Sequence, residues 1–288
     1  FVRMNPSAKP SRSRSRWLGA FLVLLFAAIA PLALVTSCQS DMIYFPRSYP
    51  AGTTERWSSE TKGRLLDYHT SQGRQRAFLQ GSLNDPRHLW IVCGGNGTVA
   101  LDWSDWLREH APREDAYLLF DMPGYGDCGG KPDPSRIRES LQAVVPMAMD
   151  EISLANQPER LRFFGHSLGA AVVMMAAGEF GIQRGVILSP FTSTMDMARE
   201  ITGLPVGFLV WHRFDNMARL DDLERRGPGM VVIVHGADDE VIPAAMGRTL
   251  ADAHPDTCQF IEVPGARHNT IPESDPEVIV KALEAAGR

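Results

Sequence analysis

A Gly-x-Ser-x-Gly segment between an apolar run and a stretch of small residues limits the fold of this chain more than any other feature. The expected strand Leu161–Gly165 leads into residues Gly165–Gly169, which read Gly-His-Ser-Leu-Gly, and the Ala- and Val-rich run Leu168–Phe180 has the composition of a buried helix. The glycines let the strand and helix backbones approach closely, while the turn lifts the serine hydroxyl into the open. The helix N-terminus supplies N–H groups and partial positive charge where an oxyanion forms. Ser167 is therefore the candidate nucleophile.

Short apolar runs alternate with longer amphipathic ones along the chain, a pattern typical of parallel sheets with helical crossovers. The apolar runs predict strands at Arg64–Tyr68, Gln75–Gln80, Leu89–Cys93, Ala116–Phe120, Leu161–Gly165, Gly185–Leu188, Met230–Val234 and Cys258–Val263. Helical spacing predicts helices at Trp103–His110, Ser135–Ser153, Leu168–Phe180, Ala244–His254 and Pro276–Ala286. The early strands follow one another without a helix, so we expect them to form an antiparallel edge. The sequence thus predicts an α/β fold with a mostly parallel central sheet flanked by helices.

Turn-forming and polar residues gather where four of the expected strands end. These clusters are Gly94–Gly97, Asp121–Gly126, Gly165–Ser167 and His235–Asp239. Because the carboxyl ends of parallel strands share one edge of the sheet, and ligands bind at that edge, we expect the functional site there.

A nucleophilic serine needs a general base, and His268 is the histidine best placed for that role. It follows the last expected strand and precedes the C-terminal helix, where a loop reaches the carboxyl edge. His166 is too close in sequence to fold back onto its neighbour, so we expect it to line the floor of the pocket. The other candidates lie at helix or strand ends or in the insertion described below: His69, His88, His110, His212 and His254.

The acid that orients the base is expected in the loop after Met230–Val234, where Asp238 and Asp239 compete. His235 opens the same loop, and we expect it to support the site by hydrogen bonding rather than to act as the base. The backbone N–H of Leu168 is the first expected oxyanion donor. A second donor is expected from Gly94–Gly97, where glycines let N–H groups turn inward; an ordinary glycine turn is the alternative interpretation.

The charge balance and the cysteines exclude some classes of function. The net charge of −5 and the pI near 5.9 imply no basic surface, so nucleic acid is not an expected partner. No Cys-x-x-Cys pair is present, so a zinc site or a thioredoxin-like motif has no support. The chemistry expected of Ser167 requires no metal or organic cofactor. A disulfide among Cys93, Cys128 and Cys258 stays open.

The N-terminus has the pattern of an export signal with an anchor. A basic segment precedes the uncharged run Trp17–Val35, and Val35–Cys38 resembles the lipobox of bacterial lipoproteins, in which the thiol of the cysteine, here Cys38, is acylated. An uncleaved transmembrane helix is the first alternative, because about 20 apolar residues span a bilayer; a buried helix is the second. The first two interpretations imply a globular part tethered to a membrane and facing the periplasm or cell exterior.

Together, these segments resemble the α/β-hydrolase superfamily, whose nucleophile, acid and base follow one another in the order Ser, Asp, His. Residues His235–Pro243 fit the family pattern His-Gly-x-x-Asp-x-x-Val/Ile-Pro, which implies Asp239 as the acid and leaves Asp238 as the alternative. Residues 95–97 resemble the family's His-Gly-Asn-Ala/Gly loop, with Gly94 in place of the histidine. That resemblance implies Asn96 as the second oxyanion donor, with Gly97 as second choice.

The chain also resembles, more narrowly, the membrane-tethered bud-emergence-type group. The resemblance rests on Ile43–Pro46 after the anchor, Asp121–Gly126 after the fourth strand and Ser189–Ser193 after the sixth. It implies a serine esterase or thioesterase that acts on a small-molecule acyl ester or thioester. Peptidase relatives leave a serine peptidase with the same triad as an alternative, and a non-catalytic membrane-tethered binding protein is the alternative of another class.

Two parts of the chain are therefore expected. Residues 1–45 form the signal or anchor and its tether, and residues 46–288 form the hydrolase domain. Residues of about 190–228 occupy the place where this fold inserts a lid, and they are rich in apolar and aromatic side chains. They predict either a wall for an acyl chain or a short pair of helices that packs on the sheet.

Overall fold

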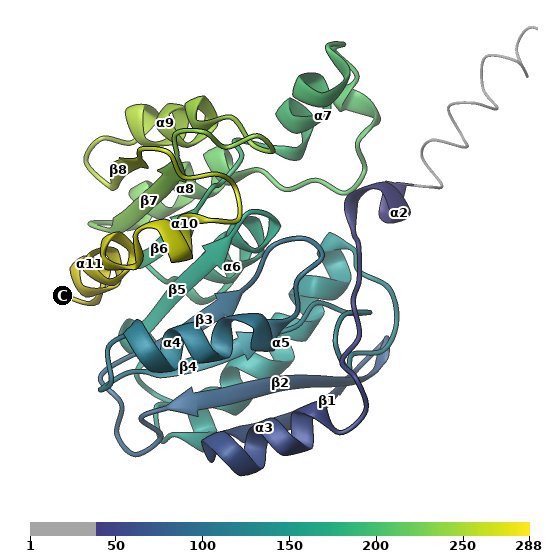
Figure 1. Cartoon of the computed structure of the whole chain (residues 1–288), viewed down its shortest axis with the longest axis vertical. Coiled ribbons are helices and arrows are strands. Elements are labelled where there is room, and N and C mark those ends of the chain that lie inside the picture. The colour runs from purple at the N-terminus through teal and green to yellow at the C-terminus, as the bar shows by residue number, and fades with distance from the viewer. Residues whose placement is uncertain (1–38) are drawn as a thin grey trace, which may run out of the picture. The chain divides into compact units, whose positions relative to one another are not determined.

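An eight-stranded sheet forms the centre of the computed structural model, which describes residues 39–288 (Figure 1). The strands are β1 (Arg64–Thr70), β2 (Gly73–Gly81), β3 (Leu89–Cys93), β4 (Ala116–Phe120), β5 (Leu161–His166), β6 (Arg184–Leu188), β7 (Met230–Gly236) and β8 (Cys258–Val263). Their order in space is β1-β2-β4-β3-β5-β6-β7-β8. β2 pairs antiparallel with β1 and β4, and every other neighbouring pair is parallel. The predicted α/β fold with an antiparallel edge is confirmed.

The position of β3 in the sheet brings two of the polar strand ends together. The chain passes from β3 to β4 on one side and returns with β5 on the other side, so β3 is flanked by both strands. Cys93, the last residue of β3, is in register with Gly165 of β5. The loops that follow these two strands therefore leave the carboxyl edge side by side, at the point where open α/β sheets bind ligands.

Helices cover both faces of the sheet. One face carries α5 (Pro134–Glu151), α6 (Leu168–Phe180), α8 (Asn216–Arg226) and α9 (Ala244–Ala253), whose buried apolar side chains join one core cluster with the sheet. The other face carries α3 (Thr53–Thr61), α4 (Ser104–His110) and α11 (Pro276–Gly287), which share a second cluster. Each core lies between one helical layer and the sheet, which is the layered arrangement that buries both faces of a parallel sheet.

The strand before Ser167 and the helix after it are the most deeply buried pair in this arrangement. All six residues of β5 are buried, and so are the residues of α6 from Leu168 to Ala177. Because β5 is covered on both faces, its side chains are buried without alternation, including those of Arg162 and His166. α6 lies between the sheet, α5 and α8, and its alanines, valines and methionines fit that confined space.

The sequence did not predict several short helices. These are α2 (Gln39–Ile43), α3, α10 (Ile271–Ser274) and the short 3₁₀ turns η1 (Ala100–Trp103), η2 (Pro158–Arg160) and η3 (Gly207–Leu209). Two further helices, α7 (Thr194–Thr202) and α8, lie in the segment for which a short pair of helices was one of the two expectations. α8 packs on α6 through the buried Leu220 and Leu223, whereas α7 buries none of its residues. α7 stands away from the sheet (Figure 1). The segment expected to be a lid thus contains one packed helix and one projecting helix.

Three of the four cysteines lie within the described residues. Cys93, Cys128 and Cys258 are free, so these three cysteines form no disulfide. Burial raises the pKa of the Cys258 thiol to about 12, which makes it a poor nucleophile at neutral pH. Cys38 and the run Trp17–Val35 lie outside the described residues. Between Gln39 and Arg288, no helix has the length and apolar character needed to span a membrane.

Candidate active site

Ser167 occupies a strained turn between β5 and α6. Its backbone has φ 56° and ψ −120°, a conformation that L-residues rarely adopt, and its N–H donates to the carbonyl of Leu188 at 2.9 Å. A methyl group on Gly169 would lie 2.2 Å from the carbonyl oxygens of Cys93 and Gly94. The glycine after the serine is therefore required because α6 starts directly against the end of β3.

His268 lies between Ser167 and Asp239 and contacts both. Its Nε2 lies 3.0 Å from Ser167 Oγ, and its Nδ1 lies 2.8 Å and 3.1 Å from the two carboxylate oxygens of Asp239. A carboxylate accepts hydrogen bonds, so Nδ1 carries the ring proton and Nε2 is left to accept the proton of the serine hydroxyl. The structure brings together the three residues that the sequence selected as nucleophile, base and acid.

Groups other than His268 also hold the Asp239 carboxylate. Its side chain is fully buried, and its Oδ1 accepts the backbone N–H groups of Val241 at 2.9 Å and Ile242 at 2.8 Å. Burial alone raises the pKa of the Asp239 carboxyl, but hydrogen bonds from His235 and His268 outweigh that effect and hold the pKa well below its usual range. The neighbouring Asp238 is exposed, and the structure does not bring it to the site.

His235 supports this carboxylate from the opposite side. Its Nε2 lies 3.2 Å from Asp239 Oδ2 and 2.9 Å from the carbonyl oxygen of Ile242. Both partners are acceptors, so Nε2 carries the proton and His235 donates rather than accepts. Its other ring nitrogen faces Gly247, where a methyl group would lie only 2.5 Å away. His235 therefore takes the supporting position that the sequence predicted for it.

His166 contacts the base rather than lining an open floor. Its ring centroid lies 4.9 Å from that of His268, and its Nε2 donates to the main-chain carbonyl of His268 at 3.0 Å. Burial lowers the pKa of His166 to about 4, with a further lowering by His268, so the ring is neutral at neutral pH. The residue before the nucleophile thus holds the loop that carries the base. No feature of the sequence indicated this role.

The loop of residues 94–97, which we call the glycine loop, lies beside Ser167. A methyl group on Gly95 would lie 3.0 Å from His166 Nδ1 and 3.3 Å from Ser167 Cβ. Within the described residues, the backbone N–H groups of Asn96 and Leu168 donate to no protein acceptor. Both are therefore available as donors at this edge of the sheet.

The side chain of Asn96 hydrogen-bonds to Ile43, Phe45 and Tyr125. Its Oδ1 accepts from the backbone N–H of Phe45 and from the Tyr125 hydroxyl, both at 2.8 Å, and its Nδ2 donates to the carbonyl of Ile43 at 2.5 Å. The carbonyl of Gly97 accepts from Arg47 Nη1 at 3.3 Å. The sequence singled out Ile43–Pro46 as a segment but did not predict that it contacts this loop.

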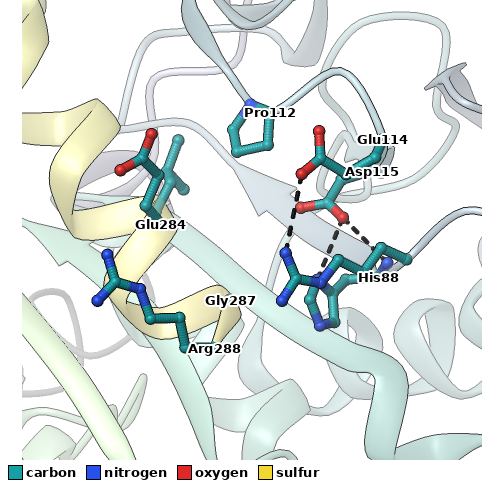
Figure 2. A pocket seen from close by; sticks show the side chains of 9 residues that line it. His88, Pro112, Glu114, Asp115, Glu284, Gly287 and Arg288 are labelled. Atoms are coloured by element: carbon teal, nitrogen blue, oxygen red, sulfur yellow. Dashed lines mark hydrogen bonds and ion pairs between the residues drawn. The ribbon is translucent and has the colours of Figure 1, made fainter.

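A second buried His–Asp pair lies at the other end of the sheet (Figure 2). The backbone N–H and Nδ1 of His88 lie 3.0 Å and 3.1 Å from Asp115 Oδ1, and Trp90 Nε1 donates to Asp115 Oδ2 at 2.7 Å. The pair borders a cavity of about 220 Å³, and the residues described as lining it include no serine, threonine or cysteine. His88 and Asp115 directly precede β3 and β4, so they lie at the amino edge. A His–Asp contact alone therefore does not locate the site.

No group of three or more His, Cys, Asp or Glu side chains in residues 39–288 is arranged to hold a metal ion. The groups gathered around Ser167 are instead a hydroxyl, imidazoles, a carboxylate and backbone amides. Their arrangement suits nucleophilic attack on a carbonyl with proton transfer through His268.

Known proteins resemble this chain in sequence and in fold. Residues 90–227 match the model described as the Alpha/beta hydrolase family. An uncharacterized protein of Mycobacterium tuberculosis is 26% identical over 273 residues, which cover 93% of this chain and 92% of that protein. Alpha/beta hydrolase domain-containing protein 17B of Homo sapiens is 25% identical over 221 residues, or 75% of this chain and 73% of that protein.

The solved structure of an esterase from Pyrococcus furiosus has a TM-score of 0.63 with this chain at 17% identity, and covers 85% of this chain and 97% of its own. At this identity the likeness concerns the fold alone. The chain has the α/β-hydrolase fold, and its residues 90–227 are similar to the Alpha/beta hydrolase family.

Proposed function

We propose that the protein is a serine hydrolase that cleaves a carboxylic ester or a thioester through an acyl-enzyme. The observation that carries the proposal is the continuous hydrogen-bonded chain from Ser167 Oγ to His268 at 3.0 Å and from His268 to Asp239 at 2.8 Å. The match to the Alpha/beta hydrolase family supports a hydrolase, and the esterase with the same fold agrees with it.

The mechanism proposed for this site has two acyl-transfer steps. His268 Nε2 takes the hydroxyl proton as Ser167 Oγ attacks the acyl carbon, and the backbone N–H groups of Asn96 and Leu168 hold the oxyanion. The tetrahedral intermediate collapses when His268 returns the proton to the leaving alcohol or thiol. Water then attacks the acyl-enzyme with the same histidine as base, and the free acid leaves.

The surroundings of His268 suit the positive charge it gains in each step. The ionised Asp239 carboxylate keeps the ring in one tautomer and stabilises the imidazolium form. The pKa of that carboxyl lies well below its usual range, because hydrogen bonds from His235 and His268 outweigh the effect of burial. Asp239 is therefore ionised at any pH at which His268 could act as a base.

Labelling with a fluorophosphonate probe tests the proposal directly. We expect wild-type protein to be labelled and Ser167→Ala not to be labelled. Ser189→Ala is a matched control, because Ser189 follows β6 with φ 45° and is fully buried, yet it is not part of the hydrogen-bonded chain from Ser167 to Asp239. Absence of labelling in the wild type, or equal labelling in Ser167→Ala, contradicts a serine hydrolase and leaves the non-catalytic binding protein.

The leaving group is the next question. p-Nitrophenyl esters of rising chain length, acyl thioesters and peptide amides can be compared by kcat/KM. The comparison separates esterase, thioesterase and peptidase activity.

We propose an acyl substrate of apolar character, because the insertion between β6 and β7 exposes Ile201, Leu204 and Phe208, whose exposed fractions are 77%, 58% and 67%. Apolar side chains exposed at this density commonly mark a binding surface.

We also propose that the N-terminal segment tethers the domain to a membrane, as in the bud-emergence-type group, with the domain in the periplasm or outside the cell. The sequence motif ending at Cys38 supports lipidation, and the run Trp17–Val35 is also compatible with a transmembrane helix. Fractionation of cells that express wild-type protein and Cys38→Ala distinguishes them. Loss of the variant from the membrane fraction favours lipidation, and retention favours a helix.

A further inference from the structure

Residues 43–47, which we call the strap, bind the glycine loop through the main chain of Ile43 and Phe45 and the side chain of Arg47. The Asn96 side chain joins the two segments as a backbone amide of a neighbouring strand would, because it accepts the N–H of Phe45 at 2.8 Å and donates to the carbonyl of Ile43 at 2.5 Å. These contacts link positions more than 50 residues apart in the sequence. The strap is thus paired to one side chain of the loop.

Tyr125 completes this contact from the core side. Its side chain is 1% exposed, and its hydroxyl donates to Asn96 Oδ1 at 2.8 Å and accepts the N–H of Phe45 at 3.1 Å. Burial, as the largest cause, raises the pKa of Tyr125 above its ordinary value, so the hydroxyl keeps its proton. Asn96, Phe45 and Tyr125 therefore form a closed triangle of hydrogen bonds.

Arg47 secures the other end of the loop. Its Nη1 lies 3.3 Å from the carbonyl oxygen of Gly97 and 2.9 Å from Asp102 Oδ2. The carbonyl of Arg47 accepts the N–H of Gly126 at 2.7 Å, which ties the strap to the loop that carries Tyr125. The strap is therefore fixed on both sides of Asn96.

The glycine loop needs such support because it has few means of holding itself. Three of its four residues are glycines, and Gly97 has φ 75°. A glycine-rich segment loses more conformational freedom on ordering than any other. Thr98 closes the loop on itself through its N–H and hydroxyl, at 3.2 Å and 2.7 Å from the carbonyl of Gly95. Asn96 provides the only side chain beyond hydrogen in residues 94–97.

We propose that the Asn96 side chain, the Tyr125 hydroxyl and the Phe45 N–H are positioning groups that aim the backbone N–H of Asn96 at the oxyanion. The inference rests on the proposed serine hydrolase function. The side chain of Asn96 is hydrogen-bonded to the strap, and its main-chain N–H has no protein acceptor in the described residues. The side chain therefore fixes the residue while the N–H stays available to donate to an oxyanion. Loss of one oxyanion donor lowers kcat about 10²- to 10³-fold in serine hydrolases.

Replacement of the positioning groups tests this inference, since each variant keeps the Asn96 N–H. Asn96→Ala removes the side-chain amide that binds the strap, and Tyr125→Phe removes the hydroxyl that donates to this amide. Phe45→Pro removes the backbone N–H that donates to Asn96 Oδ1. We expect kcat for a short p-nitrophenyl ester to fall about 10- to 100-fold in Asn96→Ala and Phe45→Pro, and less in Tyr125→Phe, with KM changed less than about threefold. Ser48→Pro is the matched proline control, because Ser48 is exposed and its N–H donates to no acceptor in the described residues.

Inhibition by a trifluoromethyl ketone separates positioning from a loss of folded protein. The ketone forms a tetrahedral adduct with an oxyanion, so its Ki should rise in proportion to the fall in kcat/KM across the variants. Misfolding would instead reduce the number of titratable sites and leave the Ki of the remaining sites unchanged. The double variant Asn96→Ala with Phe45→Pro should lose no more than the worse single variant, because both break the same contact.

Three results overturn the inference: kcat of Asn96→Ala and Phe45→Pro equal to that of Ser48→Pro, an unchanged ketone Ki, or fully additive losses in the double variant. These failures differ from failure of the proposed function. If the wild type neither hydrolyses esters nor reacts with a fluorophosphonate, the hydrolase is wrong and the inference falls with it. If the wild type is active and the variants match the control, only the positioning role is wrong.

Discussion

The imidazole of His166 lies 4.9 Å from that of His268 and donates to its main-chain carbonyl at 3.0 Å, so the residue before the nucleophile holds the loop of the base. Replacement of the His166 ring should therefore slow the proton transfers of His268, although His166 itself takes no part in them. We expect His166→Phe, which keeps a ring but no donor, to lower kcat about tenfold and stability by about 1 kcal/mol. Steady-state kinetics with urea unfolding checks both, and an unchanged kcat would contradict the role.

The low pKa of His166 leads to a second prediction for the contact between His166 and His268. Because burial lowers that pKa to about 4, the ring has no charge to lose or gain between pH 5 and pH 9. The ratio of wild-type to His166→Phe activity should therefore be constant over that range. A ratio that changes with pH would show that His166 titrates in the working enzyme.

The backbone of Ser167 provides a stability prediction that is independent of substrate. Its φ of 56° is costly for any side chain and not for glycine. We expect Ser167→Gly to be more stable than Ser167→Ala by about 1 kcal/mol, although both are inactive. Chemical denaturation of the two variants measures the difference. Equal stabilities would mean that the turn relaxes when the serine is absent.

Asp239 and its neighbour Asp238 form a natural pair of variants. Asp239→Asn should lower kcat about 10³- to 10⁴-fold, because the amide no longer fixes the tautomer or stabilises the imidazolium. Asp238→Asn should be close to the wild type, since Asp238 is exposed and Asp239 is the carboxylate that contacts His268. Kinetics on one ester substrate compares them. A larger loss of kcat in Asp238→Asn than in Asp239→Asn would show that Asp238 is the acid and that the assignment of Asp239 is wrong.

The same carboxylate predicts how stability depends on pH. Its folded pKa lies below the unfolded value because hydrogen bonds from His235 and His268 outweigh burial. Its contribution is therefore present above about pH 4 and is lost as the pH falls below that value. The acid limb of the stability curve should be shallower in Asp239→Asn than in Asp238→Asn. Superimposable curves would rule out this source of acid sensitivity.

Asp121 should give the opposite dependence. It accepts from the Ala100 N–H at 2.8 Å and the Tyr49 hydroxyl at 2.7 Å, yet burial raises its pKa to about 7. The carboxyl ionises less readily in the folded state, so stability is lost as the pH rises from about 4 through 7. We expect Asp121→Asn to gain about 2 to 4 kcal/mol on the wild type between pH 5 and pH 8. Asp105→Asn, at an exposed position, is the control for urea unfolding at both pH values.

The strands were predictable because burial on both faces leaves an unmistakable pattern. β3 and β5 are buried along their whole length, and β3 is apolar throughout, whereas Arg162 is the one charged residue within the apolar run of β5. The helices that were missed have little to bury: in α2 only Gln39 is buried, and in α3 only Thr54 and Trp57 are buried. Periodicity reports burial, so elements held mainly by caps and loops escape it.

Within the site, side-chain chemistry was readable and main-chain contacts were not. Ser167, Asp239 and His268 carry their roles in their side chains and in their places at strand ends. Phe45 acts in the structure through its N–H, and its 59% exposed ring gives no hint of the contact with Asn96. A partner 51 positions away that uses only backbone atoms leaves no mark in residue type.

The strap also has a consequence for where the catalytic part of the chain starts. Tyr44 of the strap packs edge-on against His212 at 5.4 Å, so the strap contacts the insertion as well as the glycine loop. A fragment beginning at residue 46, the expected border of the domain, would lack Ile43 and Phe45, which are two of the three partners of the Asn96 amide. The smallest fully active fragment should therefore begin before Ile43, and shortening it by a few residues should slow turnover before it lowers solubility.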